Sequence, residues 1–218
     1  MSETDSFIDE VTEEVRRDRL FKQMRKYGWI GILIVVSIVG GAAWNEWQKA
    51  SATADARAFG DAVLGALESD DPAARVAGLE ALAGADSGRD AVVGFLAADE
   101  ALRGGDRDGA RARLETLATD ASVAEPLRQL AQLKALILAG DAMPPEARDL
   151  ALADLARPGA PYRVLAMEQQ ALALVGAAKP DEALTLLRQL LQEPDATAGL
   201  RRRVTQLIVM LGGDPDAA

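Results

Sequence analysis

The stretch GGDRDGARARLETL, from Gly104 to Leu117, decides the fold because it holds a turn and the start of a new helix. Its two glycines let the chain reverse direction, and Asp106 is the kind of residue that caps a following helix. The small side chain of Ala110 allows another helix to approach closely, and Leu114 and Leu117 follow on the same face. The stretch therefore predicts the second helix of a packed helix pair.

The same pattern returns 73 residues later, in AAKPDEALTLLRQL from Ala177 to Leu190. A shift of this size is about twice the length of a two-helix repeat of about 34 to 40 residues. The matching positions are mostly small or apolar, as packed helix pairs require: Ala98/Ala171, Ala110/Ala183, Leu114/Leu187, Leu117/Leu190, Leu127/Leu200, Arg128/Arg201, Leu138/Leu211, Gly140/Gly213 and Asp141/Asp214.

From residue 50 onward, Ala and Leu recur with a period of three to four, interrupted by Pro, Gly and Asp. No stretch shows the alternation of a strand. We expect an all-α solenoid of helix pairs over residues 48–218, ending in a C-terminal capping helix. The expected helices are 50–68, 72–83, 88–103, 107–119, 123–139, 145–156, 160–176, 180–192 and 196–211. Pro72 and Pro180 suit early helical positions, and Pro194 closes the helix before it.

Towards the N-terminus, the stretch YGWIGILIVVSIVGGAAW, from Tyr27 to Trp44, contains no charged residue. As a helix it is about 27 Å long, close to the thickness of a hydrocarbon core. Tyr27 and Trp29 lie at one end, and Trp44 and Trp47 lie at the other, which is typical of aromatic belts at membrane interfaces. The pattern predicts a single transmembrane anchor over residues 27–47.

Basic residues predict the orientation of this anchor. Before the span the chain carries Arg16, Arg17, Arg19, Lys22, Arg25 and Lys26, whereas after it come only Lys49 and then Arg57. The N-terminus is therefore expected to stay in the cytoplasm, and the large domain is expected to lie across the membrane.

Three alternatives to a simple anchor remain open. Gly41 and Ala43 form a small-x-small pattern, as in a cleavable signal peptide, although the preceding segment is long and partly acidic. The apolar helix would also suit the core of a soluble protein, but no other segment here is equally apolar on all sides. Finally, four glycines suit a membrane helix pair, which is compatible with an anchor: Gly28, Gly31, Gly40 and Gly41.

Residues 1–26 form a cytoplasmic stub with the pattern of an amphipathic helix. Ser6 is an expected N-cap, acidic residues fill the first turns and basic residues the last, which suits the helix dipole. Such a helix either lies on the membrane surface or docks onto a protein partner. The candidate partner-binding residues are Phe7, Ile8, Val11, Val15, Arg16 and Arg17.

The chain has 218 residues, with 24 basic and 34 acidic side chains, and contains neither Cys nor His. This composition excludes thiol nucleophiles, Ser-His-Asp triads and metal sites built on Cys or His. The acidic excess disfavours nucleic-acid binding. Adjacent carboxylates such as Asp70 and Asp71 are common in so acidic a chain, and none marks a catalytic pair. We expect no enzymatic activity and no cofactor or metal.

One compact basic run stands out in the large domain, at Arg201, Arg202 and Arg203. The plainer interpretation is a solvated face whose arginines pair with acidic residues of the preceding repeat. The alternative is contact with an acidic partner or with lipid head groups.

The helix-pair pattern resembles tetratricopeptide repeats in a degenerate form, because the usual aromatic positions of the first helix are mostly absent. The whole arrangement, including FIDEVTEEVRRDRL (Phe7 to Leu20) and LRRRVTQLIVMLG (Leu200 to Gly212), resembles a narrower family. That family is the bacterial ancillary subunit of the Sec translocon, in its alphaproteobacterial form. Its repeat domain is also similar to that of a cell-division coordinator protein.

The resemblance implies a bacterial inner-membrane protein with a periplasmic repeat domain that acts as a non-enzymatic scaffold. The implied partners are translocase subunits, a membrane-anchored periplasmic folding factor and newly exported chains. Two other functions suit the same architecture: an accessory subunit of a respiratory or envelope-biogenesis complex, and a coordinator of cell division or cell-wall synthesis. The known coordinator is soluble, so an anchor counts against that last function.

Overall fold

A computed structural model describes residues 3–84 and 86–215, with side chains from Met24 onward except at residue 141. Its first helix, α1, runs without interruption over Glu3–Leu67. The residues expected as a helix over 50–68 are helical as far as Leu67, and they form the last part of α1 rather than a helix with its own start. Residues 45–59 contain no Pro or Gly that would end the helix. The chain divides into two compact units, residues 1–60 and 61–218.

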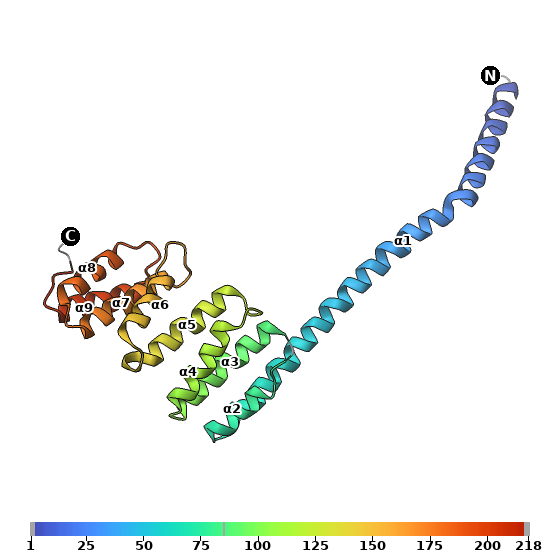
Figure 1. The fold of residues 1–218 in the computed structure, drawn as a ribbon. Helices are drawn as coiled ribbons and strands as arrows, with labels where there is room; N and C mark the ends of the chain where they lie inside the picture. Colours follow the sequence, from blue (N-terminus) through green and yellow to red (C-terminus); the bar gives the residue numbers. More distant parts are fainter. Residues whose placement is uncertain (1–2, 85, 216–218) are drawn as a thin grey trace. The chain divides into compact units, whose positions relative to one another are not determined.

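The second unit is a succession of short helices, which confirms the all-α prediction; the described residues contain no strand. Each helix packs mainly against its neighbours in sequence (Figure 1). The helices after α1 are α2 (Pro72–Glu80), α3 (Ser87–Arg103), α4 (Arg107–Thr119), α5 (Glu125–Ala139), the 3-10 turn η1 (Gly140–Ala142), α6 (Pro145–Leu155), α7 (Arg163–Gly176), α8 (Pro180–Leu191) and α9 (Ala198–Met210). The expected bounds are correct to within about three residues, as is usual at helix ends.

The helix starts follow the chemistry of their capping residues. The carboxylate of Asp71 accepts from the amide of Ala73 at 3.1 Å, directly before α2. At the start of α4, Asp106 accepts from the amide of Gly109 at 2.9 Å, as the opening stretch predicts. These side chains satisfy amides that have no partner within the helix, so each fixes where its helix begins.

The 73-residue shift relates two halves of this unit, α2–α5 and α6–α9. Ala110 and Ala183 are both fully buried, and each lies in the first turn of its helix, as predicted. The shift also relates hydrogen bonds. Arg128 Nη1 donates to the carbonyl of Val123 at 2.6 Å, and Arg201 Nε donates to the carbonyl of Ala196 at 3.0 Å. The two halves therefore share equivalent side-chain contacts as well as equivalent helix positions.

One turn differs between the halves. Gly105, between α3 and α4, has a φ of 86°, which glycine adopts readily. Its counterpart between α7 and α8 is Ala178, with a φ of 58°. A Cβ in this left-handed region is strained by about 1–2 kcal/mol. The second half thus keeps the turn geometry without the residue best suited to it.

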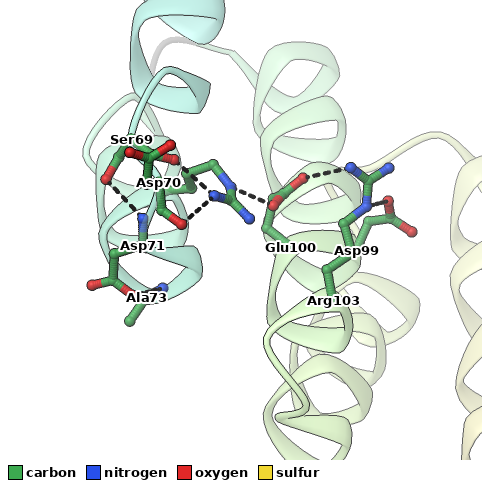
Figure 2. Close-up of polar contacts among 8 residues, drawn as sticks. Ser69, Asp70, Asp71, Ala73, Asp99, Glu100 and Arg103 are labelled. Atoms are coloured by element: carbon green, nitrogen blue, oxygen red, sulfur yellow. Dashed lines mark hydrogen bonds and ion pairs between the residues drawn. The ribbon is translucent and has the colours of Figure 1, made fainter.

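A buried ion pair joins the consecutive helices α2 and α3. Arg75 of α2 donates to Glu100 of α3 at 2.6 Å and also to the backbone carbonyls of Ser69 and Asp70. Figure 2 shows Glu100 between this turn and Arg103, whose guanidinium lies 3.3 Å from it. Glu100 is buried, so these partners compensate a charge that would otherwise be costly inside the protein.

Candidate protein-binding groove

Large apolar side chains that remain exposed after residue 60 gather on alternate helices. Those on the odd-numbered helices are Leu64, Val92, Leu102, Ile137, Leu172, Val209 and Met210. Among the described residues of the even-numbered helices, Leu150 of α6 is the one comparable side chain. In a stack of helix pairs, alternate helices share one face. The odd-numbered helices therefore present an apolar face that the chain itself does not cover.

Three of these helices, α5, α7 and α9, line a groove of about 640 Å³. Its walls are mainly apolar, and its polar side chains are two glutamines and one ion pair: Leu133, Ile137, Leu165, Glu168, Gln169, Leu172, Arg203, Gln206, Leu207 and Met210. Two buried clusters hold these helices in place: one packs α7 and α9 against α8 around Leu187 and Leu190, and the other packs α5 and α7 against α6 around Leu152. Because the core fixes three helices, the groove is a preformed surface rather than a loop that must fold on binding.

The ion pair in this groove is bidentate. Arg203 of α9 donates from Nε and Nη2 to the two carboxylate oxygens of Glu168 of α7, each at 2.8 Å. This hydrogen bonding raises the pKa of the Arg203 guanidinium above its usual range. Both residues line the groove, and Arg203 is half-exposed whereas Glu168 is buried, so the guanidinium is the more accessible partner. The pair also fixes α7 relative to α9, which keeps the groove in one shape.

The three arginines of the basic run have different roles. Arg203 pairs with Glu168 of the preceding repeat, as the plainer interpretation of the sequence predicts. Arg201 donates to the carbonyls of Leu191, Glu193 and Ala196 and so closes the turn between α8 and α9. Arg202 is exposed and, among the described residues, makes no ion pair or hydrogen bond, so it is the arginine available to a partner.

A second ion pair joins the start of α7 to the turn that follows α8. Arg163, the first residue of α7, donates to Glu193 in the turn after α8. The hydrogen bond from Arg163 lowers the pKa of the Glu193 carboxyl below its ordinary value of 4.5. In the turn between α4 and α5, hydrogen bonds from Ser122 likewise lower the pKa of Asp120. Both carboxylates stabilise turns of the fold, since each accepts hydrogen bonds from side chains or amides of its own chain.

A larger hollow of about 870 Å³ lies between α5, α6, α7 and α8. Charges of both signs line it, including Glu146, Arg148, Asp149 and Lys179. The described residues contain no group of three or more carboxylates that would hold a metal ion. With mixed charges and no such cluster, this hollow has no chemical preference that would identify a ligand.

The sequence-based site residues lie in the first unit. The side chains of Phe7, Ile8, Val11, Val15, Arg16 and Arg17 lie outside the described part of the chain; the backbone there is helical. Tyr27, Trp29, Trp44 and Trp47 are all exposed. The Trp44 and Trp47 ring centroids are 5.3 Å apart, and the Lys26 ammonium lies 5.5 Å from the Tyr27 centroid.

By length and composition, α1 contains a segment able to cross a membrane, and none of that segment is buried in the protein. The aromatic side chains near the two ends of the uncharged stretch from Tyr27 to Trp44 are likewise exposed. The assignment of Tyr27, Trp29, Trp44 and Trp47 to a membrane interface stays a prediction.

The groove residues were missed by the sequence reasoning. Ile137, Leu172 and Met210 occur among many apolar residues with helical periodicity, and most of those are core. The available signal was the repeat register: Ile137 and Met210 are 73 residues apart and are both exposed. Apolar residues that stay exposed at equivalent positions of two repeats are better candidates for binding than for packing.

Comparison with known protein families matches residues 21–208 to a tetratricopeptide repeat-like domain. The match includes the apolar segment of α1 together with almost all of the repeats. No curated protein and no solved structure gives a significant match. Repeat domains of this kind are generally protein-binding modules without catalytic activity, which agrees with the exposed groove. The chain belongs to the tetratricopeptide repeat-like domain family.

Proposed function

We propose that this protein is a non-enzymatic scaffold that is tethered to a membrane and binds other proteins through its repeat domain. The observation that carries the proposal is the preformed apolar groove between α5, α7 and α9, on a chain whose α1 is able to span a membrane. Repeat domains use such extended faces to hold a helix or a peptide. The anchor restricts that binding to partners at one membrane surface.

The proposed topology places residues 1–26 in the cytoplasm, 27–47 in the bilayer and 48–218 in the periplasm. The basic residues before the span support this orientation. Since the chain has no Cys, single-cysteine variants report on topology without background. A membrane-impermeant maleimide added to intact spheroplasts is expected to label Ser51→Cys and to leave Ser6→Cys unlabelled until the membrane is opened. Labelling of Ser6→Cys alone in intact spheroplasts would reverse the proposed orientation.

The more specific proposal is an ancillary subunit of the Sec translocon that assists newly exported proteins. The resemblance of stub, anchor and repeats to that family supports it. The test is affinity purification of the full-length protein from its own membranes in mild detergent, with mass spectrometry of the partners. Enrichment of translocase subunits and a periplasmic folding factor is expected. Stoichiometric recovery of a respiratory or envelope-assembly complex would support the scaffold function but contradict the proposed association with the translocon.

Substitutions in the stub, residues 1–26, test the association with the same partner in a second way. Serine at Phe7, Ile8, Val11 and Val15 removes the apolar stripe without shortening the chain. We expect a normal far-ultraviolet circular dichroism spectrum of the repeats and weaker recovery of the partner. Serine at the exposed Thr53 and Ala54 of α1 serves as a control that changes no apolar stripe of the stub. Unchanged recovery would show that the stub only directs insertion.

A further inference from the structure

We propose that the groove between α5, α7 and α9 takes an acidic amphipathic helix of a protein partner. This inference deepens the proposed scaffold function and rests on it. It is carried by two properties, the basic excess on the three helices that form the groove and the shortage of polar groups on the groove walls. Both are read from described residues, and neither depends on the family resemblance.

The first property is charge. The chain as a whole has 24 basic and 34 acidic residues. The three groove helices reverse this balance, with six basic residues, Arg128, Lys134, Arg163, Arg201, Arg202 and Arg203, against two acidic residues, Glu125 and Glu168. The helices between them, α6 and α8, carry five acidic residues and two basic ones. The three groove helices therefore carry a basic excess on an acidic protein, while the two charged residues that line the groove itself, Glu168 and Arg203, pair with each other.

The position of these charges matters as much as their number. Arg203 lines the groove, and Arg202 lies one helical turn before Gln206, which also lines it. Lys134 follows Leu133 on α5, with its ammonium 5.7 Å from the ring centroid of Phe95. Since exposed charges act over roughly 10 Å at ordinary salt, Arg202 and Lys134 are the cations placed to attract an acidic ligand in the groove.

The second property is the nature of the walls. Buried backbone amides need hydrogen-bond partners, and an extended peptide supplies none of its own. The groove offers the side chains of Gln169 and Gln206 and a Glu168–Arg203 pair that is already satisfied. An α-helix satisfies its own backbone and needs only apolar contacts along one face. A helix with apolar residues towards the groove and acidic residues along its edges meets both conditions.

The test compares two synthetic 20-residue helical peptides with the same leucine face, one with glutamates on the other face and one with lysines. Each is labelled and titrated, by fluorescence anisotropy, with the full-length protein in nanodiscs of neutral phosphatidylcholine, and empty nanodiscs give the background. We expect the glutamate peptide to bind about tenfold more tightly than the lysine peptide at low salt. This preference should shrink as salt is added.

Matched variants locate the binding. Arg202→Glu should weaken the glutamate peptide about fivefold, whereas Arg157→Glu, an exposed arginine outside the groove, should change it less than about twofold. Met210→Ser should weaken both peptides about fivefold. Leu150→Ser is its control, because the two side chains are 67% and 72% exposed and only Met210 lines the groove.

The outcomes separate the two levels of the proposal. If both peptides bind equally and Met210→Ser still weakens them, the groove is a docking site and the acidic preference is wrong. If the lysine peptide binds more tightly, the preference is also wrong. If neither peptide binds above the empty nanodiscs, both the acidic helix and the groove as a docking site are contradicted.

Discussion

The contribution of the buried Arg75–Glu100 pair to the stability of the repeats can be tested by substituting Glu100 and its neighbour in sequence, Asp99. The side chain of Glu100 is 7% exposed and that of Arg75 is 17% exposed, and they meet at 2.6 Å. Asp99, one residue earlier, pairs with Arg103 at 3.2 Å, but these two side chains are 45% and 67% exposed. The two carboxylates lie on the same helix and share Arg103 as a partner, but only Glu100 is buried and paired with Arg75, so Asp99 is the exposed control.

Removing one partner of a buried ion pair typically costs about 3–5 kcal/mol, because the other charge stays buried. Arg75 keeps two backbone carbonyls as acceptors and some contact with water, so we reduce this cost for Glu100→Ala to about 2–3 kcal/mol. Asp99→Ala removes an exposed pair, worth less than about 1 kcal/mol. For a unit of this size, the expected decreases in Tm are about 5–10 °C and less than about 4 °C.

Thermal unfolding of the full-length protein in nanodiscs, followed by circular dichroism at 222 nm, gives both values. The double variant Arg75→Met/Glu100→Met provides a further comparison, because no charge of the Arg75–Glu100 pair is then left buried. It should be more stable than Glu100→Ala, since apolar replacement of a buried pair is often neutral. If Glu100→Ala and Asp99→Ala lower Tm equally, the burial argument is refuted.

Three further predictions use the same unfolding assay. Ala110→Trp, and the same change at Ala183, should overpack a helix pair and cost about 1–3 kcal/mol, and neutral effects at both would refute the repeat register. Ala178→Gly should stabilise the protein by about 0.5–1 kcal/mol by removing left-handed strain, and a loss of stability would show that the turn is relaxed. Because the pKa of Glu193 is lowered by Arg163, their pairing stabilises the fold above pH 4.5, and that contribution is lost as the pH falls through the lowered pKa. The variant Glu193→Gln should therefore lose less stability on acidification than the unchanged protein, and an identical acid profile would contradict this.

Local chemistry explains which parts of the fold the sequence could predict. Asp106 as a cap, Pro180 as an early helical residue and Ala110 as a close-packing position each act through nearby residues, and all three were correctly assigned. The 73-residue shift added the long-range information that helices stack in two related halves. The continuity of α1 beyond the apolar segment is consistent with the absence of Pro and Gly from residues 45–59.

The remaining features depend on contacts that one stretch of sequence does not contain. Glu100 looked like one of many surface acids, and its burial depends on Arg75, 25 residues earlier. Glu168 and Arg203 are 35 residues apart, and only the stacking of α7 and α9 brings them together. The groove itself depends on which apolar residues stay exposed, and helical periodicity alone does not distinguish Met210 from buried Ile208.

The central claim is that the alternate-helix groove of a membrane-anchored chain is where a protein partner binds. The most direct measurement is site-specific photocrosslinking in intact membranes, with benzoyl-phenylalanine at Met210 or Leu172 in the groove and at Leu150 outside it. We predict one discrete crosslinked protein from both groove positions, identified by mass spectrometry, and none from Leu150. Equal crosslinking from all three positions, or crosslinking from Leu150 alone, would contradict the account.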